Sequence, residues 1–388
     1  MTRVRTGLEQ LLARPGDLRG RRLGLICNGA SVTGDLVHAS VALKSSKAFR
    51  LAALFGPEHG IWGDAQDLVE VGDSRDPLTG LPVHSLYGRL RAPAPEALAG
   101  LDALVFDVQD VGTRYYTFIY TMLNALEACA LHGRRLVVLD RPNPLGGTIV
   151  DGNVLDPAFR SFVGQHPLPV RHGLTVGELA LLFRDELGLR ADLRVVRMKG
   201  WRRGMDFEHT GLPWVQPSPN MPTPDTAFVY PGACLVEGTN LSEGRGTTRP
   251  FELIGAPWLD QWALARALER ERIPGARFRP AVFTPTFQKH VGRACGGVQV
   301  HVTDRKRFPA FLAYLLLIAH ARRQDRARFA WRDPPYEFEH VKRPFDILCG
   351  TDAVRRLIES GASPRRLQPE WRRALAAFRR RRTRYLLY

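Results

Sequence analysis

The sequence predicts an α/β fold in two domains: a parallel sheet flanked by helices, then a smaller α/β (α+β) domain. In the first half of the chain, short apolar runs alternate with helical patterns, which is typical of a sheet built from βαβ units. Near residue 210 the pattern changes, because five prolines within residues 213–224 exclude a helix interior or a central strand. The length of 388 residues also exceeds one typical domain. We therefore expect domains at residues 1–210 and 211–388.

Five apolar runs are the expected strands of the parallel sheet: residues 22–27, 51–55, 103–108, 136–139 and 193–198. Helical patterns in the same half cover about residues 5–14, 35–45, 116–132 and 175–187. The last one begins with Thr175 and Glu178, spaced as a capping box in which each side chain binds a free backbone amide. In the second half we expect a strand near 297–303 and helices near 257–271, 308–323 and 352–360.

The composition is that of an ordinary globular protein, with 44% hydrophobic and 24% charged residues. No run approaches the roughly 18 apolar residues of a membrane span, so no span is expected. The N-terminal residues lack the apolar segment of a signal peptide. As written, the chain is therefore expected to be cytoplasmic, whereas a trimmed N-terminus would leave an exported form open. Five scattered cysteines without CxxC spacing favour buried thiols over a disulfide framework or a zinc site.

The net charge of +16 is concentrated at the end of the chain, where residues 365–388 hold nine Arg and one Glu. One interpretation is a patch for an anionic polymer, nucleic acid or a membrane surface. The spacing of Leu367, Trp371, Leu375 and Phe378 instead predicts a terminal helix with one apolar side, and we favour a solvated, arginine-rich helix. No nucleic-acid-binding motif is present, so no nucleic-acid partner is expected.

Polar side chains follow the expected strands at the point where each ends. Asn28 follows the first, Glu58 and His59 the second, Gln109 and Asp110 the third, and residues 140–143 the fourth. Because the carboxyl ends of parallel strands share one edge of the sheet, these segments converge where such folds bind ligands. The sequence therefore predicts an active site at this edge.

Known cofactor and nucleophile motifs are missing from the sequence. No GxGxxG follows the first strand, and the glycine spacing of residues 24–31 places Ala30 where a P-loop needs lysine. HExxH and GxSxG are also absent. No cofactor and no metal ion are therefore expected.

Three segments carry the remaining chemistry: GPEHG at 56–60, FDVQDVGTRYY at 106–116 and LVEGTNLSEGRGTTRP at 235–250. Glycosidic hydrolysis needs a protonated carboxyl group and usually a second carboxylate, and sugar binding needs planar polar side chains. These loops supply both. An equally strong interpretation of Asp107, Asp110 and Asp140 is that they cap helices and hold loops in place.

Five further segments are LDRPNPLGG, PLPVRHGLTVGELA, MKGW, GLPWVQPSPNMPTPDTAFVYPGAC and CGGVQVHVTDR. Together with the three segments above, in the order in which all of them stand along the chain, they closely resemble the DUF1343 proteins. These are the exo-β-N-acetylmuramidases of glycoside hydrolase family 171. The resemblance extends from about residue 20 to about 355, and the arginine-rich tail after 364 falls outside it. It implies a Rossmann-like domain, a smaller C-terminal α/β domain and an active site in the cleft between them.

The implied reaction removes N-acetylmuramic acid from the non-reducing end of peptidoglycan fragments, in cell-wall turnover or recycling, without a cofactor. Carried onto this sequence, the resemblance makes Glu58 the leading catalytic acid. Glu243 and Glu237 are the candidates for the partner carboxylate, with Asp110 behind them. The lactyl carboxylate of the sugar calls for an arginine, for which Arg171, Arg245 and Arg249 are available.

The full set of expected substrate-binding residues is His59, Asp107, Gln109, Asp110, Arg114, Tyr115, Asp140, Asn143, Arg171, His172, Asn220, Asn240, Arg245 and Arg249. The expected partner is a peptidoglycan-derived amino sugar or muropeptide, and the oligomeric state is not predicted. The main alternative is a non-catalytic muropeptide- or sugar-binding protein on the same scaffold. A protein that binds anionic polymer through its basic tail is a third hypothesis.

Overall fold

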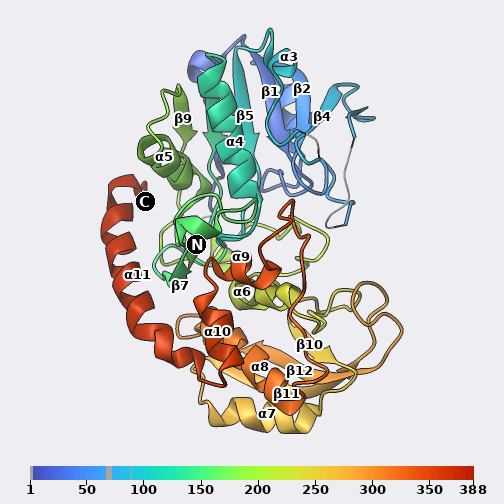
Figure 1. The fold of residues 1–388 in the computed structure, drawn as a ribbon. Helices are drawn as coiled ribbons and strands as arrows, with labels where there is room; N and C mark the ends of the chain where they lie inside the picture. Colours follow the sequence, from blue (N-terminus) through green and yellow to red (C-terminus); the bar gives the residue numbers. More distant parts are fainter. Residues whose placement is uncertain (1–2, 67–71, 89) are drawn as a thin grey trace.

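The computed structural model describes residues 3–66, 72–88 and 90–388. Figure 1 shows two domains one above the other, with a large sheet in the first and a smaller sheet in the second. Helix α11 (Gln368–Arg382) runs along one side of both domains and brings the C-terminus back beside the first domain. Among the described residues, no helix is both long and apolar enough to cross a membrane.

The first domain is built on a seven-stranded sheet in the order β3-β4-β2-β1-β5-β6-β9. Its strands are β1 (Arg22–Cys27), β2 (Arg50–Gly56), β3 (Ser74–Arg75), β4 (Pro82–Ser85), β5 (Ala103–Asp107), β6 (Arg135–Leu139) and β9 (Leu193–Val196). All neighbouring pairs are parallel except β3 with β4. The five expected strands are confirmed, whereas β3 and β4 were not predicted.

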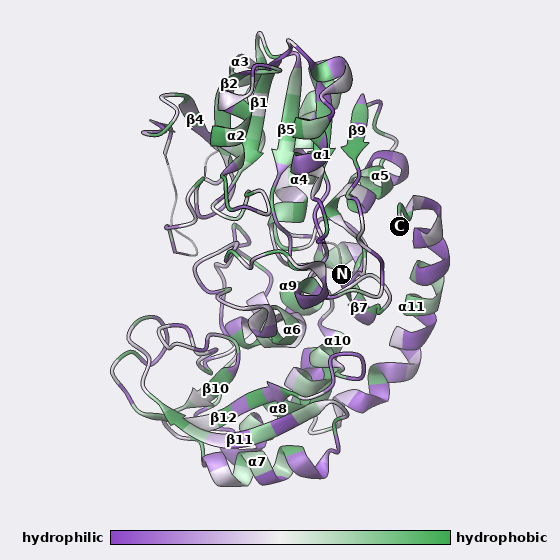
Figure 2. Ribbon diagram, turned by 180° about the vertical axis from the view of Figure 1, so that it is seen from behind, coloured by the Kyte–Doolittle hydropathy of each residue, from purple (hydrophilic) through white to green (hydrophobic). Residues whose placement is uncertain are grey.

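Alternating side chains of these strands pack into two separate cores, one on each face of the sheet. On β5, Leu104 and Phe106 join one core and Ala103 and Val105 the other, as the two-residue repeat of a strand requires. The first core is covered by α3 (Pro95–Leu98), α4 (Phe118–Leu131) and α5 (Val176–Glu186), and the second by α1 (Gly7–Ala13) and α2 (Ala39–Ser45). The expected capping box at Thr175 and Glu178 is present. Figure 2 shows β1, β2 and β5 as mostly apolar.

The strand order fixes where a ligand would bind. If the six parallel strands are numbered by their order in the chain, their order across the sheet is 3-2-1-4-5-6. The direction in which the chain adds strands therefore reverses between β1 and β5. Doubly wound sheets bind ligands beyond the carboxyl ends of the strands at this reversal. In Figure 2 the arrowheads of β1 and β5 point toward the second domain. The segments after β1, β2 and β5 therefore lie where the two domains meet.

The second domain has a three-stranded antiparallel sheet in the order β10-β12-β11. Its elements are α6 (Pro224–Ala233), β10 (Leu253–Ala256), α7 (Gln261–Arg270), β11 (Ala276–Phe283), β12 (Cys295–Val302), α8 (Ala310–Gln324), α9 (Pro344–Cys349), α10 (Ala353–Glu359) and α11 (Gln368–Arg382). The expected strand and helices of this half are confirmed as β12, α7, α8 and α10. Strands β10 and β11 were not predicted, and neither were α6, β7 (Asp151–Val154) and β8 (Pro169–Arg171).

Helix α11 joins the two domains from the outside. Trp371, Leu375 and Phe378 are buried, which confirms the apolar side expected from their spacing. On the same helix, Arg379 donates to the Val150 carbonyl at 3.1 Å and Arg382 to the carbonyls of His172 and Gly173 at 3.1 and 2.9 Å. The tail is therefore not simply a solvated helix, because part of its positive charge binds backbone carbonyls of the first domain.

Arg114 joins the domains from the inside. Its side chain is fully buried, and it donates to the carbonyls of Asn153 and Leu168 in the first domain at 2.9 and 3.0 Å. It also donates to the carbonyls of Leu348 and Cys349, in α9 of the second domain, both at 2.9 Å. These bonds satisfy buried carbonyls of both domains at once, so one guanidinium fixes how the domains sit together.

We expect Arg114→Met to lower the free energy of unfolding by about 3 kcal/mol or more, because it leaves four buried carbonyls without this donor. The midpoint of thermal unfolding measures the loss. Arg372→Met, on the exposed face of α11, is the control and should unfold close to wild type. An Arg114→Met protein that unfolds with the wild-type midpoint would contradict this role.

Candidate active site at the domain junction

A narrow pocket lies between the domains and is lined by residues of both. From the first half of the chain it takes Glu58, His59, Tyr115, Tyr116, Thr117, Phe118 and Val163, and from the second Ser218, Asn220, Met221, Tyr230, Cys234, Glu237, Arg245, Phe251, Tyr336 and Glu337. Its volume is about 40 Å³, so a sugar ring enters only as lining side chains move aside. The pocket combines buried carboxylates with aromatic rings, as expected of a ligand site.

Glu58 reaches the pocket from the loop that follows β2. The loop turns through His59 and Gly60, whose φ angles of 70° and 77° lie in the left-handed region. This conformation is costly for a histidine and is typical of functional sites. The Thr117 hydroxyl donates to Glu58 Oε2 at 2.5 Å. Thr117 is the N-cap of α4 but makes no capping bond with its side chain, so its hydroxyl serves the carboxyl group of Glu58 instead.

Tyr87 stands next to two carboxyl groups. Its hydroxyl donates to Glu337 Oε2 at 3.2 Å. Burial, followed by the charges of Glu58 and Glu337, raises the pKa of Tyr87 far above its usual range. The tyrosine therefore stays protonated and acts as a hydrogen-bond donor to this acidic corner.

Glu237, Arg245 and Glu243 form a buried chain of charges, ending at Lys289. Arg245 Nη2 donates to Glu237 Oε1 at 2.9 Å, and its Nε lies 3.5 Å from Glu243 Oε1. Lys289 Nζ donates to Glu243 Oε2 at 2.9 Å. The chain gives each of the two carboxylates a cationic partner, which buried charges require.

Glu237 remains ionised although it is buried. Burial alone would raise its pKa, but the charge of Arg245 and hydrogen bonds from Tyr336 and Arg245 hold the pKa of Glu237 below its ordinary value. The Tyr336 hydroxyl donates to Glu237 Oε2 at 2.7 Å. The pocket therefore presents one carboxylate that is stabilised in its charged form.

Six of the residues expected from the sequence line the pocket: Glu58, His59, Tyr115, Asn220, Glu237 and Arg245. Sequence reasoning missed Tyr116, Thr117, Ser218, Tyr336 and Glu337, which also line it. Tyr116 and Thr117 directly follow Tyr115, so the TRYYT run was the signal for them. Tyr336 and Glu337 lie in a loop far along the chain, where nothing in the local pattern marks them.

Several other expected site residues support the fold around the pocket. Asp107 is fully buried and accepts two bonds from Arg141, at 2.6 and 2.8 Å. Gln109 donates to the Pro142 carbonyl at 2.8 Å, and Asn143 to the Leu174 carbonyl at 2.9 Å. These contacts hold the loops after β5 and β6 together, so these polar side chains act as ties between loops.

Five further expected residues also contact protein groups. Asn240 donates to the Arg328 carbonyl at 2.7 Å, and Arg171 donates to the Leu145 carbonyl. Asp110 Oδ2 accepts from the backbone of Gly112 at 2.6 Å, and His172 Nε2 lies 3.7 Å from the same oxygen. Arg249 is half-exposed beside Glu252. Arg114, which joins the domains, belongs with these residues.

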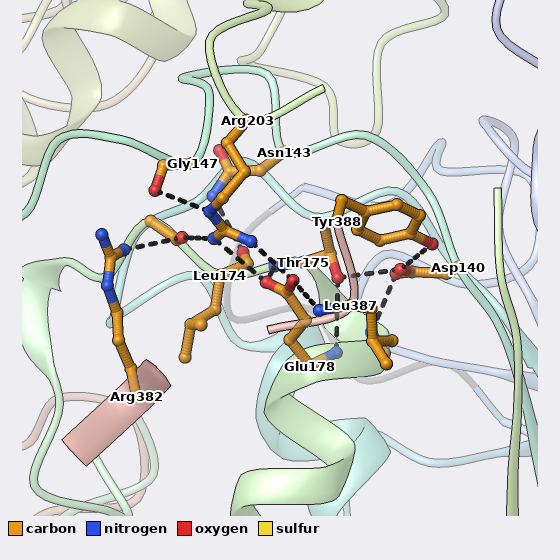
Figure 3. A network of polar contacts seen from close by, with 12 residues as sticks. Asp140, Asn143, Gly147, Leu174, Thr175, Glu178, Arg203, Arg382, Leu387 and Tyr388 are labelled. Atoms are coloured by element: carbon orange, nitrogen blue, oxygen red, sulfur yellow. Dashed lines mark hydrogen bonds and ion pairs between the residues drawn. The ribbon is translucent and has the colours of Figure 1, made fainter. Parts of the chain in front are cut away.

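Asp140, another expected site residue, anchors the C-terminus of the chain (Figure 3). Its carboxyl group accepts from Thr175 Oγ1 at 2.8 Å, the Gly177 amide at 2.9 Å and the Tyr388 hydroxyl at 2.7 Å. Beside it, Glu178 accepts from the Leu387 amide at 2.8 Å and from Arg203. Burial raises the pKa of Asp140 to about 7. Asp140 and Glu178 thus fasten the last two residues to the first domain.

No group of three or more His, Cys, Asp or Glu side chains among residues 3–66, 72–88 and 90–388 is arranged to hold a metal ion. All five cysteines are buried free thiols. The polar groups that line the pocket are carboxyl and hydroxyl groups, the imidazole of His59, the amide of Asn220, the thiol of Cys234 and the guanidinium of Arg245.

Comparison with known proteins gives one consistent family. Residues 23–225 match the N-terminal domain and residues 228–388 the C-terminal domain of the exo-β-N-acetylmuramidase NamZ family. The chain is 48% identical over 388 residues to the peptidoglycan β-N-acetylmuramidase NamZ of Bacillus subtilis (strain 168), covering 92% of that protein. The second match reaches the last residue, which corrects the expectation that the tail lies outside the resemblance.

Two solved structures are similar over their full lengths. Both are DUF1343 family proteins from Bacteroides fragilis NCTC 9343. One has a TM-score of 0.90 at 36% identity, covering 100% of both chains. The other has a TM-score of 0.79 at 31% identity, covering 100% of this chain and 99% of the other. The α/β fold with a second, smaller domain is therefore shared by solved relatives.

Asp140 makes stability depend on pH. Because its pKa is about 7 in the folded protein and about 3.8 when exposed, its protonated form stabilises the fold fully below about pH 3.8. That contribution is lost as pH rises through about 7. Asp140→Asn stays neutral, so its stability relative to wild type should rise between pH 4 and pH 8, by at most about 1.4 kcal/mol per pH unit. Urea unfolding of both proteins across this range measures the difference, and a constant difference would contradict it.

Proposed function

The chain belongs to the exo-β-N-acetylmuramidase NamZ family, and we propose that its interdomain pocket removes N-acetylmuramic acid from the non-reducing end of peptidoglycan fragments. The observation that carries this proposal is the pairing, in one pocket, of Glu58 with the ionised Glu237. Glycoside hydrolysis needs one carboxyl group that gives a proton and a second that remains charged. Such a reaction would serve cell-wall turnover or recycling and uses no cofactor.

Glu58 is the proposed general acid. Its Oε2 accepts from Thr117, so a proton on Glu58 would be carried by Oε1. That proton passes to the glycosidic oxygen as the bond from this oxygen to the anomeric carbon breaks. The released sugar takes up water at the anomeric carbon, and one proton of that water restores the acid. Every step uses groups that line the pocket and one water molecule.

Glu237 is the proposed partner carboxylate. A negative charge that persists in the pocket stabilises the positive charge that develops on the sugar ring in the transition state. Glu243 has the same type of side chain but is bound by Lys289 and Arg245 and is not a lining residue. Asp110 is held by the Gly112 amide. These contacts favour Glu237 over the two other candidates.

Three arginines are candidates for binding the lactyl carboxylate of the sugar, and one of them lines the pocket. Arg245 lines the pocket, whereas Arg171 binds a backbone carbonyl and Arg249 lies beside Glu252. His59 Nδ1 lies 2.8 Å from the Ala65 carbonyl and must donate to it, so its Nε2 is available to accept from a sugar hydroxyl. We assign Arg245, His59 and Asn220 to substrate binding.

We also propose that the first domain is Rossmann-like and that the active site lies in the cleft between the domains. The 3-2-1-4-5-6 order of the parallel strands supports a Rossmann-like first domain. The lining of the pocket by both halves of the chain supports an active site in the cleft between the domains.

We expect Glu58→Gln to lower kcat by about 10²–10⁴-fold while the protein folds normally, because the amide keeps the volume but carries no transferable proton. The assay is hydrolysis of a chromogenic β-N-acetylmuramide, with the matching N-acetylglucosaminide as the substrate control. Glu370→Gln, at an exposed position of α11 outside the pocket, is the protein control. Binding of the sugar by the wild type without turnover would instead support a non-catalytic sugar-binding protein.

Tyr336→Phe tests the role of Glu237. Removing the hydroxyl that donates to Oε2 raises the pKa of Glu237. Because the reaction needs the ionised form of Glu237, the acidic limb of the pH profile of kcat/KM should move to higher pH. At pH values above that limb, kcat/KM should change less. A profile that keeps its acidic limb, or moves it to lower pH, would remove Glu237 from the mechanism.

A further inference from the structure

A two-residue turn, Glu337-Phe338, lies between the pocket and a wide groove. The turn is closed by two backbone hydrogen bonds of 2.9 Å that Tyr336 and Glu339 exchange. Glu337 lines both the pocket and the groove, whereas Phe338 lines the groove. The turn thus holds a carboxylate at the reaction site and a ring directly beside it.

The residues of this turn are unusual for its geometry. Glu337 and Phe338 have φ angles of 47° and 63°. A two-residue turn with both φ angles positive prefers sequences such as Asn-Gly, because a side chain crowds the backbone in this region. Strain of this kind concentrates at functional sites. The chain therefore bears a local cost to hold these two side chains in place.

Three aromatic rings pack into one wall, of which Phe162 and Phe338 line the groove. The ring of Tyr87 lies 5.9 Å from that of Phe162 and 5.6 Å from that of Phe338, and the latter two are 5.3 Å apart. Tyr87 also donates to Glu337 on the pocket side. Through this wall, the position of Phe338 in the groove is tied to that of the carboxylate in the pocket.

The groove has the size and the lining that a sugar needs. Its volume is about 1090 Å³, and Phe338 is 38% exposed in it. The guanidinium of Arg91 lies 4.8 Å above the ring of Phe338. Asn124 and Gln165 add amide groups to the lining. Aromatic rings pack against the apolar face of a sugar ring, and planar multi-donor side chains bind its hydroxyl and acetamide groups.

We propose that this groove binds the leaving group: the N-acetylamino sugar joined to the reducing side of the bond that is cut. Phe338 and Arg91 are then specificity-determining residues that favour a glycan over a small synthetic aglycone. This inference rests on the proposed function. An enzyme that encloses the terminal sugar must give the rest of the glycan a way out, and the groove meets the pocket at Glu337.

The test compares kcat/KM for two substrates of the full-length protein. One is a chromogenic aryl β-N-acetylmuramide, and the other is N-acetylmuramic acid β-linked to N-acetylglucosamine. Phe338→Asn removes the ring but keeps a residue that tolerates a positive φ, and Arg91→Gln changes an exposed side chain. Each should lower the ratio of disaccharide to aryl glycoside activity about two- to tenfold, the range that one stacking contact gives. Arg372→Gln on α11 is the control and should keep the wild-type ratio.

Each other outcome overturns a defined part of the inference. Equal losses on both substrates would show that these side chains act on the pocket through the aromatic contacts of Phe338 and not on the leaving group. Wild-type kcat/KM on both substrates in both variants would show that the groove takes no part in the reaction. A wild-type protein that cuts neither substrate would overturn the proposed function, which separates that failure from a failure of the groove alone.

Discussion

The four hydrogen bonds of Arg114 are the contact on which the rest of the structure depends. They hold carbonyl groups of both domains around one buried guanidinium. The pocket takes Glu58 from one domain and Glu237 from the other, so the relative position of these carboxyl groups follows from how the domains are fixed. Tyr115, Tyr116 and Thr117, which follow Arg114 in the chain, line the same pocket. Arg114, which joins the domains, and three residues that line the pocket therefore belong to one segment of the chain.

Burial explains why the charges of the site come as a chain and not as single groups. A buried carboxylate needs a cation or hydrogen-bond donors to stay charged. Glu237 has Arg245 and Tyr336, and Glu243 has Arg245 and Lys289. Glu58 accepts a hydrogen bond from the hydroxyl of Thr117. This difference in surroundings supports the different roles proposed for these carboxyl groups.

Much of the fold could be predicted from the sequence, because buried strands and amphipathic helices leave periodic patterns. The central strands β1, β2, β5 and β6 are continuous apolar runs, and their helices repeat every three to four residues. Strands β3 and β4 could not be found this way, because both are short, β3 is exposed and β4 is only partly buried. Strand β11 alternates buried and exposed residues but contains Pro280, which argues against a strand in a sequence.

The site could be predicted only in part, because the same polar side chains serve structure and chemistry. What separates the arginines is whether each lines the pocket, together with the kind of partner it has. Arg114, Arg171 and Arg382 donate to backbone carbonyls, which are fixed by the fold and cannot be exchanged for a ligand without breaking it. Arg245 pairs with carboxylates of side chains instead, and such pairs can be shared with a substrate. This distinction depends on contacts across long stretches of sequence, and no local pattern of residue types records it.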